Sequence, residues 1–317
     1  MELFVKAKNR IKRFIDKRKK DIPYWIDIQK RKYTSIFNYE RLAQDIPELI
    51  TKEYPYNAYY GIADLVKKEK GIPKRQRLEA AVEHGVGDYS QDLWDALLSQ
   101  KKIYVFGSAR DELLRKLHPD KELIHHKNFM AYVKSAYGPI RTKFEKMRFG
   151  KTLLCFPTHS THHVVDRFDQ TPLIQEIEKI RIEHNFDTVL VSVYWKDIHE
   201  GRHLPYIDAG YKIVTMGHIY DNCFLRRLKA VLSISDMVIT NDVGSHIGYA
   251  IHECVPVYQF FVPIEHVALD EEVDFSIYGM TDSHQVFSKE CTSLFGTYSE
   301  EITEAQREFV RLNWGEF

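Results

Sequence analysis

The segment Pro157-Thr-His-Ser-Thr-His-His163 places hydroxyls and imidazoles directly after a buried apolar run. Thr158, His159 and Ser160 have the side chains that hydrogen-bond phosphate oxygens, whereas three histidines within five residues also suggest a zinc site. No cysteine or acidic residue stands at a usual zinc spacing from these histidines, so we expect no metal here. A third interpretation stays open, in which the segment is a hydroxyl-capped turn with surface histidines.

A second polar turn follows the apolar run that ends at Thr240. Gly244-Ser245 would open a helix that extends to about Glu253, and the first N–H groups of a helix have no partner within it. These N–H groups and the positive end of the helix dipole suit a phosphate. We therefore expect ligand contacts from Thr240, Asn241, Gly244, Ser245 and His246. An ordinary turn of a βαβ unit accounts for the same pattern without a ligand.

Two further strand ends carry side chains with ligand chemistry. Tyr194 and Trp195 follow an apolar run, and their rings could stack on a base or a sugar or fill the core. Gly217-His218 follow the next run, and Asp221 comes before a striped helix. His218 could approach a nucleotide, while Asp221 could serve only as an N-cap.

The first half of the chain offers one catalytic pattern, the loop Glu83-His-Gly-Val-Gly-Asp88. Histidine titrates near neutral pH, so His84 suits a general base that removes a proton from a hydroxyl. Asp88 could be the base itself or could hold the imidazole of His84. A loop histidine without catalytic use is the alternative.

Strands and helices must alternate to place these turns together. In the second half, apolar runs predict strands at residues 152–156, 188–193, 212–215, 237–240 and 255–260. Between them, Thr171 is a good N-cap with Pro172 as first helical residue, and Phe224, Leu225, Leu228 and Val231 stripe a second helix. This alternation predicts an α/β fold with a parallel, doubly wound sheet. Its strand ends would share one edge, where open α/β sheets bind ligands.

The first half alternates more weakly. A strand is expected to end near residue 84, a clearer strand covers 102–106, and a helix covers about 111–117. Residues 139–150 are basic and polar and are expected to connect two domains. Near the end of the chain, residues 300–312 predict one more helix.

The order and spacing of these pieces resemble the donor-binding half of GT-B glycosyltransferases of bacterial capsule and lipopolysaccharide synthesis. The resemblance covers roughly residues 151–261, and the first half matches more weakly, mainly at Glu83-His84-Gly85. It is carried by these segments: Leu153–Ser160, Val191–Trp195, Gly217–Asp221 and Thr240–Tyr249.

The resemblance implies two Rossmann-like domains with a cleft between them. It implies a basic helical segment at 1–50, an acceptor-side domain at 51–148, a nucleotide-sugar-binding domain at 149–290, and a C-terminal helix in 291–317 that returns to the first domain. Sugar would pass from a nucleotide-sugar donor to a glycan or lipid-linked acceptor of a surface polysaccharide, without a metal or separate cofactor. His159 would contact the donor phosphate, His84 would be the base, and Glu253 would bind ribose hydroxyls.

Other functions remain open from the sequence. They are a glycerol-phosphate-type transferase with a CDP-linked donor, a nucleotide-sugar epimerase, and a non-catalytic subunit of an assembly complex that binds no nucleotide.

Composition narrows the class of protein. The formal net charge of the 317 residues is zero, which argues against a general nucleic-acid binder. The four cysteines form no Cys-x-x-Cys pair, so we expect reduced thiols. No apolar run is long enough to span a bilayer and the first residues lack the apolar core of a signal peptide, so we expect a cytoplasmic protein.

The first twenty residues differ from this neutral average. They contain nine lysines and arginines but only two acidic residues, Glu2 and Asp16, and apolar residues from Phe4 to Ile15 recur at helical spacing. Such a basic amphipathic helix can lie on an anionic membrane surface. It can equally be a solvated helix packed on the first domain.

Overall fold

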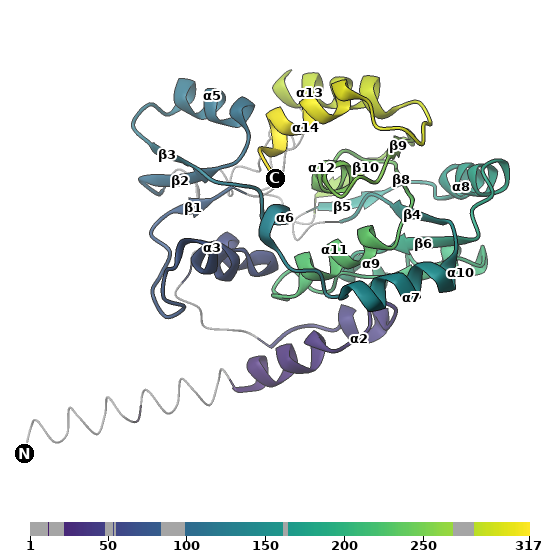
Figure 1. The fold of residues 1–317 in the computed structure, drawn as a ribbon, viewed down its shortest axis with the longest axis horizontal. Helices are drawn as coiled ribbons and strands as arrows, with labels where there is room; N and C mark the ends of the chain where they lie inside the picture. Colours follow the sequence, from purple (N-terminus) through teal and green to yellow (C-terminus); the bar gives the residue numbers. More distant parts are fainter. Residues whose placement is uncertain are drawn as a thin grey trace, which may run out of the picture.

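A computed structural model describes residues 12, 22–47, 53, 55–83, 99–160, 164–268 and 282–317. The chain forms an α/β fold with two parallel sheets and one short antiparallel ribbon (Figure 1). The predicted α/β class with parallel sheets is confirmed.

The larger sheet has the strand order β7-β6-β4-β8-β9, and all neighbouring strands are parallel. Its strands are β4 (Thr152–Phe156), β6 (Thr188–Ser192), β7 (Lys212–Val214), β8 (Met237–Thr240) and β9 (Val257–Gln259). Each lies within a run that the sequence predicts as a strand. The chain enters the sheet at β4, builds outward through β6 and β7, and then crosses back to β8. The strand order therefore reverses between β4 and β8, as in Rossmann-like sheets.

Helices cover both faces of this sheet, and its strands are accordingly apolar along their length (Figure 1). These helices are α8 (Thr171–Glu183), α9 (Trp195–His199), α10 (Leu204–Asp208), α11 (Phe224–Ser233) and α12 (Ser245–His252). The predicted stripe of α11 is buried at Leu225, Leu228 and Val231. Helix α8 begins at Thr171, one residue earlier than predicted, because the Asp169 carboxylate accepts from the Thr171 N–H.

The smaller sheet has the parallel order β1-β2-β3, with β1 (Ala81–Val82), β2 (Lys102–Val105) and β3 (Glu122–His125). Around it lie η1 (Pro55–Gly61), α3 (Ile62–Lys70), α5 (Ser108–Leu117) and α6 (Phe129–Tyr132). The segment expected to connect two domains contains a helix, α7 (Pro139–Phe149). Pro139 suits its first turn, and Gly150 ends it with a left-handed backbone angle that favours glycine.

Both ends of the described chain pack against other parts of the fold. They comprise helical residues 22–32, α2 (Tyr39–Ala43), α13 (Asp282–Phe295) and α14 (Glu304–Trp314). Fully buried Arg31 donates to the carbonyl of Leu42, and Arg227 of α11 donates to the carbonyl of Arg31. The early segment is thus fastened to the second half of the chain (Figure 1). Helix α14 starts at Glu304, later than predicted, because Thr303 and Gln306 form a capping box.

One ribbon has no counterpart in the sequence-based expectations. β5 (Val164–Arg167) pairs antiparallel with β10 (Glu265–Ala268), and Asp166 lies opposite His266 in that register. Because β5 follows the turn after β4, the ribbon lies close to the carboxyl edge of the larger sheet.

Of the four cysteines, Cys155, Cys223 and Cys291 are buried and Cys254 is exposed, all as free thiols. Within the described parts of the chain, no helix combines the length and the apolar character needed to span a membrane.

Candidate functional site

A cavity of about 360 Å³ opens at the carboxyl ends of β4, β6, β7 and β8. It includes the point between β4 and β8 where the strand order reverses, which is where open α/β sheets bind ligands. The turns after these strands contribute Pro157–His159, residues 192–194, residues 215–216 and residues 242–246. The remaining lining is mostly apolar and comes from both halves: Tyr60, Ile62, Phe129, Phe156, Asp166, Phe224, Leu225, Leu228 and Tyr249.

The backbone places Tyr60 in this lining. Tyr60 has a left-handed φ of 56° and donates its N–H to the carbonyl of Ile219 in the second half. Gly61 follows with φ of 75°, and a Cβ there would lie 2.8 Å from Asn222 Cα. The close approach of η1 to the start of α11 therefore requires glycine, and it brings an aromatic ring of the first half to the sheet edge.

The turn after β4 is tied to the turn after β8. The N–H of Thr158 donates to Asn241 Oδ1 at 2.8 Å. His159 is exposed at the cavity, and its ring centroid lies 4.7 Å from that of Tyr194. His159 Nδ1 is 3.1 Å from the carbonyl of Ser160, which makes Nδ1 the protonated nitrogen of a neutral ring. His159 can therefore donate to a ligand from Nε2 only as an imidazolium.

Helix α12 begins at the cavity. Gly244 is its N-cap and supplies no side-chain cap, so the first N–H groups have no side-chain acceptor at that position. A Cβ on Gly244 would lie 2.9 Å from His246 Nδ1, so a larger residue there would force the histidine ring to shift. Trp314 also holds the start of the helix, since its Nε1 donates to the carbonyl of Ser245 at 3.2 Å.

His246 lines the same cavity as a neutral ring. Its Nε2 lies 2.9 Å from Thr240 Oγ1, whose hydroxyl donates to the carbonyl of Asp242 at 3.0 Å. The imidazole is therefore the donor in the contact with Thr240. Burial lowers the pKa of His246 to about 3. His246 consequently adds no positive charge for a phosphate at neutral pH.

Two carboxyl groups meet at the hydroxyl of Thr158. Asp166 Oδ2 and Asp242 Oδ2 each lie 3.0 Å from Thr158 Oγ1. The other oxygen of Asp166 is 2.6 Å from Nδ1 of His266. Burial raises the pKa of Asp242, and the hydrogen bond to Asp166 raises the pKa of His266. The cavity thus contains groups that can donate and accept protons.

Three predicted site residues lie under the turns rather than in the cavity lining. The fully buried hydroxyl of Ser160 donates to Asp197 Oδ1 at 2.8 Å and holds the β4 turn to α9. Thr240 is also fully buried, and Asn241 is 2 % exposed. Both hold the β4 and β8 turns in shape.

Gly217 and Asp221 serve the core at the start of α11. Asp221 is fully buried and pairs with Arg227 at 2.8 Å, and its Oδ1 accepts from the N–H of Cys223, which is the N-cap of α11. Gly217 has φ of 98°, and a Cβ there would lie 3.1 Å from Asp221 and from Arg227. The expectation that Asp221 caps this helix directly is wrong, because the helix begins three residues later, at Phe224, and its N-cap is Cys223.

Trp195, His218 and Glu253 also lie outside the cavity lining. The rings of Trp195 and His218 pack with centroids 4.2 Å apart, and His218 is 6 % exposed. Glu253 is the C-cap of α12 and pairs with Lys229 at 3.1 Å. Because an eight-residue helix is about 12 Å long, Glu253 is far from the end that faces the cavity.

Several predicted residues fall outside the described parts of the chain. These are His84, Gly85 and Asp88 of the glycine-rich loop, and His162 and His163 of the β4 turn. Among the described residues, no group of three or more histidine, cysteine, aspartate or glutamate side chains could hold a metal ion.

The sequence-based reasoning missed Asp166, Asp242, His266 and Tyr60. Asp242 stands in the turn already selected for phosphate binding, so its position after a strand was a usable signal. Asp166 and His266 are one hundred residues apart and meet only through the β5–β10 register, which the local pattern does not show.

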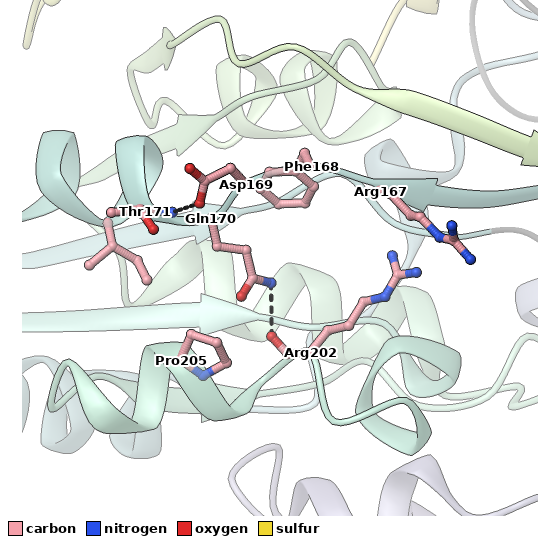
Figure 2. Close-up of a pocket in the computed structure, with 8 residues that line it drawn as sticks. Arg167, Phe168, Asp169, Gln170, Thr171, Arg202 and Pro205 are labelled. Atoms are coloured by element: carbon pink, nitrogen blue, oxygen red, sulfur yellow. Dashed lines mark hydrogen bonds between the residues drawn. The ribbon is translucent and has the colours of Figure 1, made fainter.

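A second cavity, of about 350 Å³, lies between the start of α8 and the loop before α10 (Figure 2). The Gln170 amide donates to the carbonyl of Arg202 at 2.9 Å, and Asp169 accepts from Thr171. Arg202 also donates to the carbonyl of Asp166 and pairs with Asp197 at 3.3 Å. This cavity therefore lies beside the β5 segment that carries Asp166.

Comparisons with known proteins add little to this geometry. No family model matches the sequence, and no curated protein matches it. The fold is similar to the crystal structure of a protein assigned as a UDP-N-acetylglucosamine 2-epimerase from Listeria monocytogenes. The two share 11 % sequence identity over 79 % of this chain and 72 % of that chain, with a TM-score of 0.32. The chemistry of the site is therefore argued from the residues of this chain.

Proposed function

We propose that this protein is a glycosyltransferase that transfers a sugar from a nucleotide-activated donor to a surface-polysaccharide acceptor of capsule or lipopolysaccharide type. The supporting observation is the cavity at the β4–β8 switch point, where α12 begins beside the polar turn after β4. The donor diphosphate would lie on Gly244 and Ser245, and Thr158 and His159 would contact the donor from the other turn.

The electrostatics of the cavity fit this role. The first N–H groups of α12, which receive no side-chain cap, and the dipole of α12 would stabilise the negative charge that develops on a leaving nucleotide, so the proposal needs no divalent metal. Aromatic side chains in the lining, Tyr60, Tyr194 and Phe224, offer rings for a sugar or a base.

A transferred sugar requires a base for the acceptor hydroxyl. From the sequence, His84 takes this role with Asp88 as its partner, and both lie outside the described residues. Asp242 provides a second candidate within the cavity lining.

Thermal unfolding with UDP, GDP, CMP, CDP and dTDP tests the donor site. A nucleotide at 100 times its dissociation constant stabilises the native state by about 2.7 kcal/mol and raises the melting temperature. We expect the Ser245→Glu variant to lose this rise, because the new carboxylate occupies the position of the phosphate. A rise with CDP alone would favour a glycerol-phosphate-type donor. If none of the nucleotides raises the melting temperature, a non-catalytic subunit is favoured.

Ser108→Glu is the matched control. Ser108 is the first residue of α5 after the glycine N-cap Gly107, as Ser245 is in α12 after Gly244. Glutamate near a helix N-terminus favours the fold in both positions. Equal nucleotide affinity of wild type and Ser245→Glu by calorimetry would remove the phosphate site from the proposal. Release of an altered free sugar without an acceptor would identify an epimerase.

A further inference from the structure

Four side chains form a continuous chain of hydrogen bonds from the cavity to the surface. Asp242 lines the cavity, and its Oδ2 lies 3.0 Å from Thr158 Oγ1. Thr158 Oγ1 is 3.0 Å from Asp166 Oδ2, and Asp166 Oδ1 is 2.6 Å from His266 Nδ1. Asp166 is 7 % exposed, whereas the side chain of His266 is 47 % exposed. The interior end of this chain is therefore a carboxyl group and the outer end an imidazole.

The proton count of this chain follows from its geometry. A threonine hydroxyl has one proton and can donate to only one of two carboxyl oxygens. The second contact of the same length then requires a proton on one carboxyl group, which donates to Thr158 Oγ1. Asp166 has a second partner, since its Oδ1 lies 2.6 Å from His266 Nδ1, whereas burial raises the pKa of Asp242. The resting site thus has a protonated Asp242, while Asp166 and His266 share the proton between Oδ1 and Nδ1.

We propose that Asp242, Thr158, Asp166 and His266 form a proton relay in which Asp242 is the general base and His266 exchanges the proton with water. This inference rests on the proposed function, because transfer of a sugar to a hydroxyl releases one proton in the cavity. The relay gives that proton a route to solvent through protein groups.

The steps conserve protons. His266 first releases the proton of Nε2 to water, which leaves its Nδ1–H facing Asp166. Asp242 is then primed when its proton moves to Thr158 Oγ1 while the Thr158 proton moves to Asp166 Oδ2. The ionised Asp242 then takes the proton of the acceptor hydroxyl. At the same time the hydroxyl oxygen of the acceptor bonds to the sugar carbon, and the bond between that carbon and the nucleotide phosphate breaks. This restores the resting protonation of Asp242.

The relay also explains how two carboxyl groups can lie near a diphosphate without repelling it. A protonated Asp242 is neutral, and Asp166 and His266 cancel each other, so the four groups together carry about no net charge. The other charged or titratable groups around them are His159 on the β4 turn, His246 on α12 and Arg202. Arg202 donates to the carbonyl of Asp166 and positions β5 without contacting the carboxyl groups of the relay.

The first test does not depend on turnover. Infrared difference spectra of wild type at pH 7 should contain the carbonyl band of a protonated buried carboxyl group, and Asp242→Asn should remove it. NMR titration of the His266 ring should show a lower pKa in Asp166→Asn, near the 6.5 of an unperturbed histidine. A band that survives in Asp242→Asn, or an unchanged His266 titration in Asp166→Asn, would overturn the relay.

The second test measures transfer with the donor found by thermal unfolding. Asp242→Asn should lower the rate by about 100-fold or more with donor affinity retained, as expected for loss of a general base. Thr158→Val should slow transfer and Thr158→Ser should restore it, because serine keeps the hydroxyl. Slow transfer by His266→Ala should recover with added imidazole, a small proton carrier.

Two outcomes of this assay count against the relay. Normal transfer by Asp242→Asn would exclude Asp242 as the base, and a large loss confined to His84→Ala would place the base in the first half. Failure of wild type to bind any nucleotide would instead refute the proposed function, and the infrared and NMR results would then decide the protonation of the chain by themselves.

Discussion

At the scale of single residues, burial and hydrogen bonding shift the pKa values of the site in different directions. His246 and His266 have the same side chain, yet burial lowers the pKa of one and the Asp166 carboxylate raises the pKa of the other. Burial also disfavours the charged form of Asp242, and this raises the pKa of its carboxyl group. Side chains that look equivalent in the sequence therefore have pKa values shifted in opposite directions by the fold.

His246 makes stability depend on pH. Its pKa is lowered on folding, so the stability that it contributes is present above the unfolded pKa of about 6.5 and is lost as pH falls toward 3. Between these values wild type should lose about 1.4 kcal/mol of unfolding free energy per pH unit relative to His246→Gln. Urea unfolding from pH 7 to pH 4 measures this difference. His125→Gln, at an exposed histidine, is the control, and parallel curves for wild type and His246→Gln would contradict the prediction.

At the scale of elements, the position of α12 depends on α14. A Cβ on Gly248 would lie 2.4 Å from the ring of Trp314, so these helices pack as closely as a glycine allows. Asn128 of the first half donates from its side chain to the carbonyl of Trp314 at 3.0 Å. The last helix thus links the N-terminal end of α12 to the segment that begins α6.

Gly248→Ala should therefore destabilise the protein. The added methyl overlaps Trp314, and overpacking of this kind costs about 1–3 kcal/mol, more than the gain in helix propensity of about 1 kcal/mol at its upper range. Urea unfolding measures the change. Gly138→Ala, where an added Cβ meets no atom within 4 Å, should cost less. Adding Trp314→Leu to Gly248→Ala should cost less than the sum of the two single changes, and simple additivity would show that the contact does not limit packing.

At the scale of the whole molecule, the two halves of the chain share one cavity. The sheet edge of the second half supplies hydroxyls, carboxyls and N–H groups, while Tyr60, Ile62 and Phe129 come from the first half. Residues 22–43 bind to the second half through Arg31, Ile36 and Ala43. The segment before them, residues 1–20, carries the basic amphipathic pattern and, apart from Lys12, lies outside the described residues.

That segment should bring the protein to an anionic membrane. Each basic residue near such a surface adds about 1 kcal/mol of attraction, and the apolar face would enter the headgroup region. We expect the full chain to sediment with anionic vesicles and a chain without residues 1–20 to remain in solution. Neutral vesicles are the control, and equal sedimentation of both chains would leave the segment with a structural role only.

The sequence by itself determined the strands of the larger sheet, their parallel direction and the edge on which the polar turns lie. Those properties follow from local apolar runs, turn residues and the alternation of strands with helices. It did not determine which turns meet, because the crossover that sets β8 beside β4 depends on packing of the whole sheet.

Only the tertiary structure showed which of the predicted residues line the cavity and which belong to the core. Asp221, Ser160 and Thr240 resemble ligand contacts in the sequence but are fully buried with protein partners. Asp166 and His266 came together through an antiparallel ribbon across one hundred residues. Burial raises the pKa of Asp242, and burial is a property of the surrounding fold rather than of the residue.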